Sequence, residues 1–448
     1  MPKPKDLIGE IRRKEYMLDM ELSAEAEEGA RNIRGTLNRT LKLLAQDLYS
    51  TETHFVLELV QNADDNSYPA GVTPELRFEL EEARLSVRNN ETGFTVENVR
   101  ALCNAGKSTK SKREGYIGEK GIGFKSVFAV SDRPEIHSNG FHFRFDASGA
   151  SPLGYVVPEW LGGVDEESGT RIVLPAKEGQ AFRADLLGDL SAELLLFLRK
   201  LRRLEFTHRS EGGSLVAARR DTPHGVRLTE KAIKDVFAAP TVKQSSYLLA
   251  HHTLPVADVK EDRRPGMETT EIVLAFPLTA NGVALATTRP SVFAFLPIRT
   301  FGFNFIVQAD FLLSSSREDI HRAWPWNVRI REHISAAFAH ALPLFKKNDA
   351  LASSFLEFVP NPADIPDTFF KHAATQIVSR LGAEDCVLGA SGMWRKPSEI
   401  LVASAEFRAL FSNDDVVLVL KKRVHPTFVW VTGPGIGSDR RNGNRRRS

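Results

Sequence analysis

The chain has 448 residues, of which 42% are hydrophobic and 26% charged, a balance typical of a globular protein with a sizeable core. Its formal net charge of +2 gives no whole-chain argument for nucleic acid or an anionic membrane as a partner. The two distant cysteines do not suggest a disulfide framework. The sequence shows neither a secretory signal nor an apolar run of roughly 18 residues, as a membrane span needs. We therefore expect a cytoplasmic or nuclear protein that is not secreted.

Length and the loop-like stretches predict five parts. Residues 1–30 form an N-terminal helical segment, 31–205 a first α/β domain and 206–350 a second α/β domain. Residues 351–432 are a region of uncertain fold, and 433–448, rich in Arg, Gly and Asn, read as a disordered basic tail.

Taken in chain order, the first clear elements precede residue 90. Helix formers are dense from residue 6 to residue 48, and a second helix is predicted over residues 54–65. Alternating segments at 76–80 and 85–87 then predict a hairpin.

A second hairpin is marked more clearly. Residues 135–137 and 141–145 flank Asn139-Gly140, a pair favoured where both turn residues take positive φ. Residues 171–174 predict a further strand, and residues 184–203 a largely helical segment that closes the first domain.

The second domain mixes both element types. Residues 292–296 and 303–313 are strand-like, whereas residues 326–342 have the spacing of a helix. Beyond residue 361 the pattern weakens.

The helix at 54–65 carries polar side chains beside an apolar stripe. At about 100° per residue, Glu58, Asn62 and Asp65 fall within a narrow arc. A carboxylate beside a carboxamide suits a general base, Glu58, next to an oxygen ligand for magnesium, Asn62. A solvated acidic helix face explains the same pattern equally well.

Two glycine-containing segments follow. Asn89 to Gly93 forms a polar turn after a predicted strand, which by itself is only a turn. Gly118, Gly121 and Gly123 are spaced so that backbone amides can approach an anion.

Two other glycine motifs fit this loop poorly. A dinucleotide fingerprint has the opposite spacing and directly follows a strand. A Walker-type phosphate loop needs lysine directly after its second glycine, where this chain has Phe124.

In this order the motifs resemble the Bergerat-type, or GHKL, superfamily of gyrase, heat-shock chaperone, histidine kinase and MutL ATPases. A basic segment at 106–110 and Gly169-Thr170-Arg171 complete the match. The amino-acid sequences of residues 54–66 and 115–128 are most similar to those of the sacsin and NO VEIN-like group. This resemblance implies an α/β fold, namely a Bergerat-type two-layer α/β sandwich with a mixed sheet covered by helices, followed by a second α/β middle-type domain.

The resemblance also implies ATP and magnesium as cofactors, with residues 31–205 as the ATP-binding domain. Glu58 would act as the general base, and Asn62 would hold magnesium. The residues expected at the nucleotide are Asn62, Asp65, Asn89, Gly93, Lys107, Gly118, Gly121, Ile122, Gly123, Phe124 and Thr170. Lys107 and residues 108–115 would form a lid.

A second catalytic candidate lies in the second domain. Ser316-Arg317-Glu318 resembles the segment of the ninety-kilodalton heat-shock chaperone whose arginine reaches the γ-phosphate. A guanidinium there stabilises charge in phosphoryl transfer. A local ion pair of Arg317 with Glu318 or Asp319 is the alternative.

One position departs from the superfamily, which mostly has aspartate where this chain has Asn89. Loss of a charge-assisted bond to adenine costs about 1–2 kcal/mol, or roughly ten- to thirtyfold in affinity. The substitution therefore predicts weak ATP binding.

Together these features predict a Mg-ATP-binding protein, a slow ATPase whose lid and middle domain close on ATP or ADP in a chaperone-like or scaffold role. A protein client or a second copy in a homodimer is the expected further partner. One alternative is a nucleotide-gated scaffold without hydrolysis, and another is a chromatin- or DNA-linked ATPase of the MORC or MutL type. The near-neutral charge argues against nucleic acid as a partner.

Overall fold

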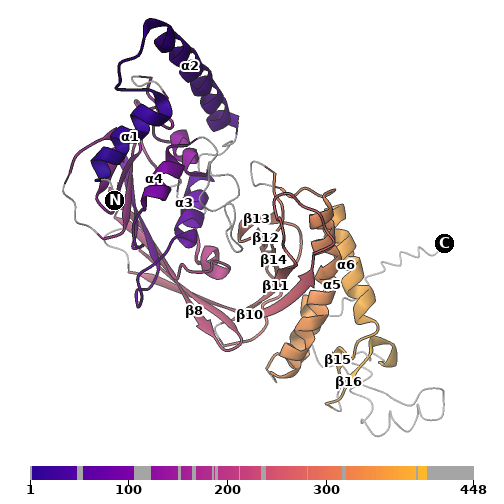
Figure 1. Ribbon diagram of the computed structural model, residues 1–448. Helices are drawn as coiled ribbons and strands as arrows, with labels where there is room; N and C mark the ends of the chain where they lie inside the picture. Colours follow the sequence, from indigo (N-terminus) through magenta and orange to yellow (C-terminus); the bar gives the residue numbers. More distant parts are fainter. Residues whose placement is uncertain are drawn as a thin grey trace, which may run out of the picture.

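The structure of the protein is a computed structural model, drawn in Figure 1. It describes residues 3–47, 54–104, 123–149, 153–163, 168–183, 186, 190–210, 212–233, 239–279, 281–314, 319–348, 350–389 and 392–400. The α-helices are α1 (Pro4–Tyr16), α2 (Ala24–Asp47), α3 (His54–Asp65), α4 (Val96–Leu102), α5 (Pro325–Lys346) and α6 (Thr368–Leu381). The short 3-10 helices are η1 (Gly123–Ala129), η3 (Ala192–Leu196), η4 (Ala352–Phe358), η5 (Pro362–Asp364) and η6 (Pro397–Glu399).

The strands form one large sheet and one small hairpin. The first half of the large sheet contains β1 (Glu75–Glu81), β2 (Arg84–Asn89), β3 (Glu135–Ser138), β4 (Phe141–Arg144), β5 (Glu159–Trp160), β6 (Thr170–Pro175) and β7 (Arg203–His208). The second half contains β8 (Gly213–Thr222), β9 (Gly225–Ile233), β10 (Thr241–Pro255), β11 (Thr269–Leu278), β12 (Ser291–Ala294), β13 (Leu296–Thr300) and β14 (Ile306–Ala309). Strands β15 (Val387–Leu388) and β16 (Trp394–Arg395) make the hairpin.

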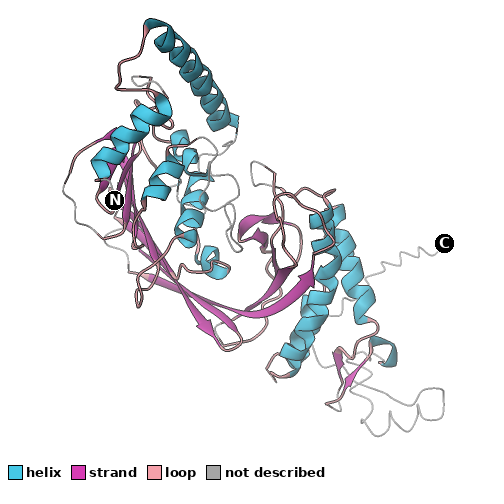
Figure 2. Ribbon diagram, viewed as in Figure 1, coloured by secondary structure: helices cyan, strands magenta, loops and turns pink. Residues whose placement is uncertain are grey.

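The 14 strands of the large sheet lie in the order β13-β12-β14-β11-β10-β9-β8-β7-β1-β2-β6-β3-β4-β5. Strands β1 and β7 pair in parallel, as do β12 and β14, whereas the other described neighbours are antiparallel. Figure 2 shows this curved sheet with helices against both of its ends. The protein is therefore α/β with a large mixed sheet and helices, as expected.

The clearest expected elements are confirmed. Helix α3 covers residues 54–65, and β1 and β2 form the first predicted hairpin. In the second hairpin, β3–β4, the turn residues Asn139 and Gly140 have φ of 47° and 78°. Strand β6 and helix α5 also lie where the sequence predicts them.

The sheet carries two apolar cores, which meet at β10. The first core includes Phe78 and Phe143, and the second includes Phe276 and Phe338. Within β10, Tyr247 belongs to the first core and the next residue, Leu248, to the second. Because successive side chains of a strand point to opposite faces, the two cores lie on opposite faces of one sheet. Helix α5 packs on β10 and β11 over the second core.

The expectation of a helix over residues 184–203 is wrong for the described residues. They contain the five-residue η3, and β7 begins at Arg203. The physical reason is that the backbone here bonds to distant side chains: Asp64 accepts amides of the segment, and Arg219 donates to its carbonyls. These long-range hydrogen bonds take the place of the backbone hydrogen bonds that a continuous helix would form.

Three of the predicted domain boundaries fall inside structural elements or a shared core. The boundary after residue 30 lies within α2, and the boundary after residue 205 lies within β7. Phe355 of η4 and Phe370 of α6 share the second core with α5, so the boundary after residue 350 divides residues of one core.

Helix α6 lies beyond residue 361, where the sequence pattern weakens. The five-part division stays a prediction. Residues 401–448, including the basic tail, lie outside the described residues.

Among the described residues, no helix combines the length and apolar character required to cross a bilayer.

Three histidines lie where α5 packs on β10. The Nδ1 atoms of His252 and His340 are 2.9 Å apart, so one ring donates a proton and the other accepts it. The rings of His252 and His333 are stacked with centroids 5.8 Å apart. Burial, and then the charges of His340, His333 and Arg380, lower the pKa of His252. The interface thus favours the neutral form of the His252 imidazole.

We predict that acid weakens this interface. The unfolded chain takes up the His252 proton near its ordinary pKa of 6.5, at a higher pH than the folded chain does. The free energy of unfolding therefore falls as the pH drops through 6.5, and His252→Phe should reduce this fall. Urea unfolding at pH values from 7.5 to 5 measures the fall in the free energy of unfolding. His224→Gln, which changes an exposed histidine in a turn, is the control. An unchanged pH dependence in His252→Phe contradicts the prediction.

Candidate functional site

Two segments far apart in the sequence meet at the polar face of α3. A Cβ atom added to Gly123 would lie 2.3 Å from Oε2 of Glu58 and 4.0 Å from Nδ2 of Asn62. The main chain at the start of η1 therefore lies directly against these two side chains. Glu58 is buried and Asn62 is half-buried. We call Glu58, Asn62 and Gly123 the helix group.

Two neighbours of the helix group are buried. Asp65 is buried, and its carbonyl oxygen accepts a hydrogen bond from Lys200 Nζ at 3.2 Å. Phe124 packs in the first core, its ring centroid 6.1 Å from that of Phe145. The side chain of Phe124 is thus used for packing, which leaves its main chain as the part able to meet a ligand.

A second group forms at the ends of three adjacent strands. Asn89 of β2 lies opposite Thr170 of β6, and Thr170 lies opposite Ser138 of β3. The hydroxyls of Ser138 and Thr170 are 2.5 Å apart. Gly169 has φ of 99°, and a Cβ atom there would lie 2.3 Å from the Asn89 carbonyl oxygen, so this close approach requires glycine.

The polar turn after β2 packs against the same strand ends. Gly93 has φ of 88°, and a Cβ there would lie 2.8 Å from Cβ of Asn139. The next amide, that of Phe94, donates to Ser138 Oγ at 2.8 Å. We call Asn89, Gly93, Ser138 and Thr170 the strand-end group.

Tyr68 links the two groups. Its hydroxyl donates to the carbonyl oxygen of Ala63 in α3 at 2.7 Å. Burial raises the pKa of Tyr68, and a contact with the Asn89 carboxamide opposes that rise. The two polar atoms of Asn89 are buried without a well-formed hydrogen bond to the described residues. Buried amide groups are normally hydrogen-bonded, so this carboxamide has capacity for a ligand.

Several expected site residues lie outside the described residues: Lys107, Gly118, Gly121, Ile122 and Arg317, with the lid at 108–115. The two ends of the segment that carries Arg317 are nevertheless described. Leu313 and Ile320 form an antiparallel bridge, and the Ser314 amide donates to the Asp319 carbonyl at 2.9 Å.

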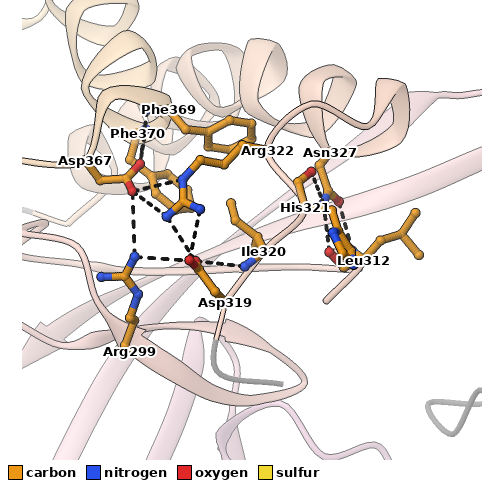
Figure 3. A network of polar contacts seen from close by, with 10 residues as sticks. All are labelled: Arg299, Leu312, Asp319, Ile320, His321, Arg322, Asn327, Asp367, Phe369 and Phe370. Atoms are coloured by element: carbon orange, nitrogen blue, oxygen red, sulfur yellow. Dashed lines mark hydrogen bonds and ion pairs between the residues drawn. The ribbon is translucent and has the colours of Figure 1, made fainter. Parts of the chain in front are cut away.

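An ion-pair network fixes the C-terminal end of that segment (Figure 3). Arg322 donates to both oxygens of Asp319, at 2.9 and 3.0 Å, and to Asp367 at 2.8 Å. Arg299 adds a contact to Asp319 at 3.4 Å. Against the effect of burial, the hydrogen bonds from Arg322 and the Ile320 amide lower the pKa of Asp319. Asp367 also caps α6 through the amides of Phe369 and Phe370. Asp319 is one of the two acidic residues named above as an alternative, local partner of Arg317. Its carboxylate is paired with Arg322.

Sequence reasoning missed the roles of two charged residues beside the motifs. Asp64 accepts the amides of Arg199, Lys200 and Leu201 at 2.8 to 2.9 Å. No local pattern signals this role, because the three donors lie about 135 residues further along the chain.

Lys125, directly after Phe124, is the second. Its Nζ donates to the carbonyls of Leu102 and Tyr155 at 2.6 and 2.7 Å and lies 4.4 Å from the ring centroid of Phe145. Burial lowers the pKa of Lys125 to about 8. This lysine therefore anchors η1 to the core and is occupied by main-chain acceptors.

Residues 36–150 match the Sacsin domain family. That range contains the helix group and the Asn89 turn, and it ends before Thr170 and Arg317. The chain is also 37% identical over 431 residues to Protein NO VEIN of Arabidopsis thaliana, covering 88% of this chain and 15% of that protein. These findings support the resemblance to the sacsin and NO VEIN-like group.

More distant similarity reaches a bacterial chaperone. The chain is 26% identical over 194 residues to Chaperone protein HtpG of Serratia proteamaculans, covering 36% of this chain and 30% of that protein. With HtpG of Yersinia pestis it is 27% identical over 185 residues, covering 34% and 29%. The chain thus spans 15% of the length of the NO VEIN protein and less than a third of each HtpG. This similarity hints at the GHKL superfamily, whose membership stays a proposal.

We predict that Lys125→Met destabilises the protein in a pH-dependent way. At pH 7 two buried carbonyls lose their donor, at a cost of about 1–3 kcal/mol. Between about pH 8 and 10.5, the two pKa values concerned, the unfolded lysine still binds a proton that the folded one has lost. Wild-type stability from this group therefore rises with pH, and the gap to Lys125→Met widens. Urea unfolding at pH 7 and 9.5 measures the gap, with exposed Lys231→Met as the control. A gap that narrows with pH contradicts the burial argument.

Proposed function

We propose that the chain binds ATP with magnesium between α3 and the segment that ends at Gly123, in a Bergerat-type two-layer sandwich. The observation that carries the proposal is the contact of Gly123 with Glu58 and Asn62. It joins an acidic helix face to the end of a glycine-rich loop, which are the two parts that a site for a phosphate chain and its cation needs. The similarity to HtpG supports the same assignment.

The residues of the helix group fit magnesium bound together with phosphate. Among the described residues, no three His, Cys, Asp or Glu side chains gather as a metal site. Magnesium commonly takes one or two protein oxygens and completes its shell with water and phosphate. Asn62 would supply such an oxygen beside Glu58. When bound, magnesium would neutralise charge on the phosphate oxygens.

The chain's own chemistry in hydrolysis would come from two residues. Glu58, buried beside the Gly123 main chain, would orient a water molecule and accept its proton. Arg317 would contribute positive charge to the phosphate end from the second domain. The main chain of Gly118, Gly121, Ile122, Gly123 and Phe124 would donate amides to the phosphates, with Lys107 as a charged partner.

The strand-end group would hold the adenine. Asn89 has a buried carboxamide without a well-formed hydrogen bond to the part of the chain that the structure describes, and the Thr170 hydroxyl lies one strand away, held by Ser138. Because an asparagine oxygen is uncharged, we expect this end to bind weakly. Asp65 would support the group from the α3 side.

The output we propose is slow turnover linked to closure of residues 108–115 and the second domain, in a chaperone-like or scaffold role. Both similar HtpG proteins are named as chaperones, which supports a chaperone-like role. No observation in the described residues favours a DNA-linked role.

A calorimetric titration with ATP, with and without magnesium, tests the binding proposal. We expect saturable binding that magnesium strengthens. Gly123→Ala should weaken it by about tenfold, or roughly 1.4 kcal/mol, because a methyl group only 2.3 Å from Glu58 Oε2 would push the Gly123 main chain, a proposed amide donor, away from the phosphates. Gly29→Ala in α2, where a Cβ meets nothing within 4 Å, is the matched control and should bind as wild type does. No heat and no thermal shift up to millimolar nucleotide would end the proposal.

A second prediction concerns hydrolysis. Glu58→Ala should lower phosphate release by about 10²-fold or more, the usual range for loss of a general base, while nucleotide binding changes little. Phosphate release is measured beside ATP binding for the same protein sample. Equal release in wild type and variant would instead favour the scaffold without hydrolysis. Loss of binding in Glu58→Ala would show that the base assignment is wrong.

A further inference from the structure

Residues 192–201, which we call the connector, contain η3, lead to the start of β7 and contact both halves of the sheet. On one side the connector is bound to α3. The buried Asp64 carboxylate accepts three of its amides, those of Arg199, Lys200 and Leu201. In return, Lys200 Nζ donates to the carbonyls of Asp65 and Asn66 at the end of α3, at 3.2 and 2.5 Å.

The carbonyl side of the connector is held by one cation. Arg219 of β8 donates to the carbonyls of Leu195, Leu196 and Leu198 at 2.8 to 3.0 Å. Burial lowers the pKa of Arg219, and the nearby charges of Asp221 and Asp64 act against that effect. Charge-assisted hydrogen bonds are stronger than neutral ones. The connector is thus held between the buried Asp64 carboxylate and the half-buried Arg219 guanidinium.

On its other side the connector contacts β12 and the turn between β12 and β13. The rings of Phe197 and Phe293 meet edge to face with centroids 5.1 Å apart. The Arg199 guanidinium lies 4.9 Å from the ring centroid of Phe295, within the range of a cation–π contact. Phe293 belongs to the first core, on the sheet face opposite the one that α5 covers.

The residue contacted by Arg199 is strained. Phe295 has φ of 63°, a left-handed conformation that is unfavourable for a bulky side chain. It is the single residue between the paired Ala294 and Leu296. Its amide donates to Oε1 of the buried Gln308 in β14 at 2.7 Å. A residue in such a conformation keeps it only while the surrounding contacts hold it there.

We propose that the connector couples α3 to the β12–β13 turn, so that the nucleotide state of the helix group biases Phe295 between a docked and a relaxed conformation. The path runs from Asp64 through residues 199–201 to Phe295 and Gln308. The proposal rests on the proposed function for its ligand alone, because the mechanical link itself consists of contacts between protein groups. Two sites that bias one two-state element are coupled in free energy.

The link is tested first without nucleotide, by hydrogen exchange with mass spectrometry. Asp64→Asn keeps one acceptor oxygen and weakens the clamp, and Arg199→Ala removes only an exposed side chain. In both variants exchange over residues 291–309 should quicken by about tenfold, while exchange in α5 is unchanged. Arg227→Ala, an exposed arginine of β9, is the matched control. Unchanged exchange at 291–309, or an equal rise throughout the protein, overturns the coupling.

The second arm adds ATP and magnesium and measures binding in the same samples. Wild type and Arg227→Ala should show slower exchange at 291–309 upon binding, and Arg199→Ala should bind ATP without that change. Slowing of equal size in Arg199→Ala overturns the proposal. Absence of ATP binding in every sample refutes the proposed function instead, and the nucleotide-free arm then still decides whether the connector links α3 to Phe295.

Discussion

The alternation of side chains along β10 determines where both cores of this protein lie. Tyr247 turns into the first core and Leu248 into the second, because neighbours on a strand face opposite ways. A shift of one residue in the pairing of β10 with β9 or β11 would exchange the two sets. The register of Tyr247 with Val226 and of Leu248 with Phe276 therefore fixes the side on which α5 packs. The side that the connector reaches follows from the same register.

The candidate site depends on close main-chain approach at glycines more than on the number of polar side chains. Gly123 brings one segment against Glu58, and Gly169 brings β6 against the carbonyl of Asn89. The charged residues of the same motifs are divided between two tasks. Glu58 and Asn62 line the approach, whereas Asp64 and Lys125 are occupied by main-chain groups. Each of the two motifs thus supplies both a residue of the proposed site and an anchor that positions it.

The sequence predicted well those elements whose signal is local. The extent of α3 follows from its apolar stripe, and the β3–β4 hairpin follows from Asn139-Gly140, whose φ angles are both positive. Residues 184–203 were misjudged because a leucine-rich run resembles a helix, while its hydrogen-bond partners Asp64 and Arg219 are remote in sequence. The link through Tyr68 could not be predicted either, since nothing near it in sequence specifies a contact with Asn89. The convergence of Glu58 with Gly123 agrees with the order of motifs, although motif order alone gives no distance.

The position of β7 in the sheet matters for any attempt to study the first half of the protein alone. It pairs in parallel with β1 on one side and antiparallel with β8 on the other. A chain ended at residue 205 would keep half of this strand and leave the edge of β1 partly unpaired. Bare strand edges recruit other chains into mixed sheets and aggregates. A soluble fragment would therefore have to extend at least through β8 and β9, with a charged or covered strand at its new edge.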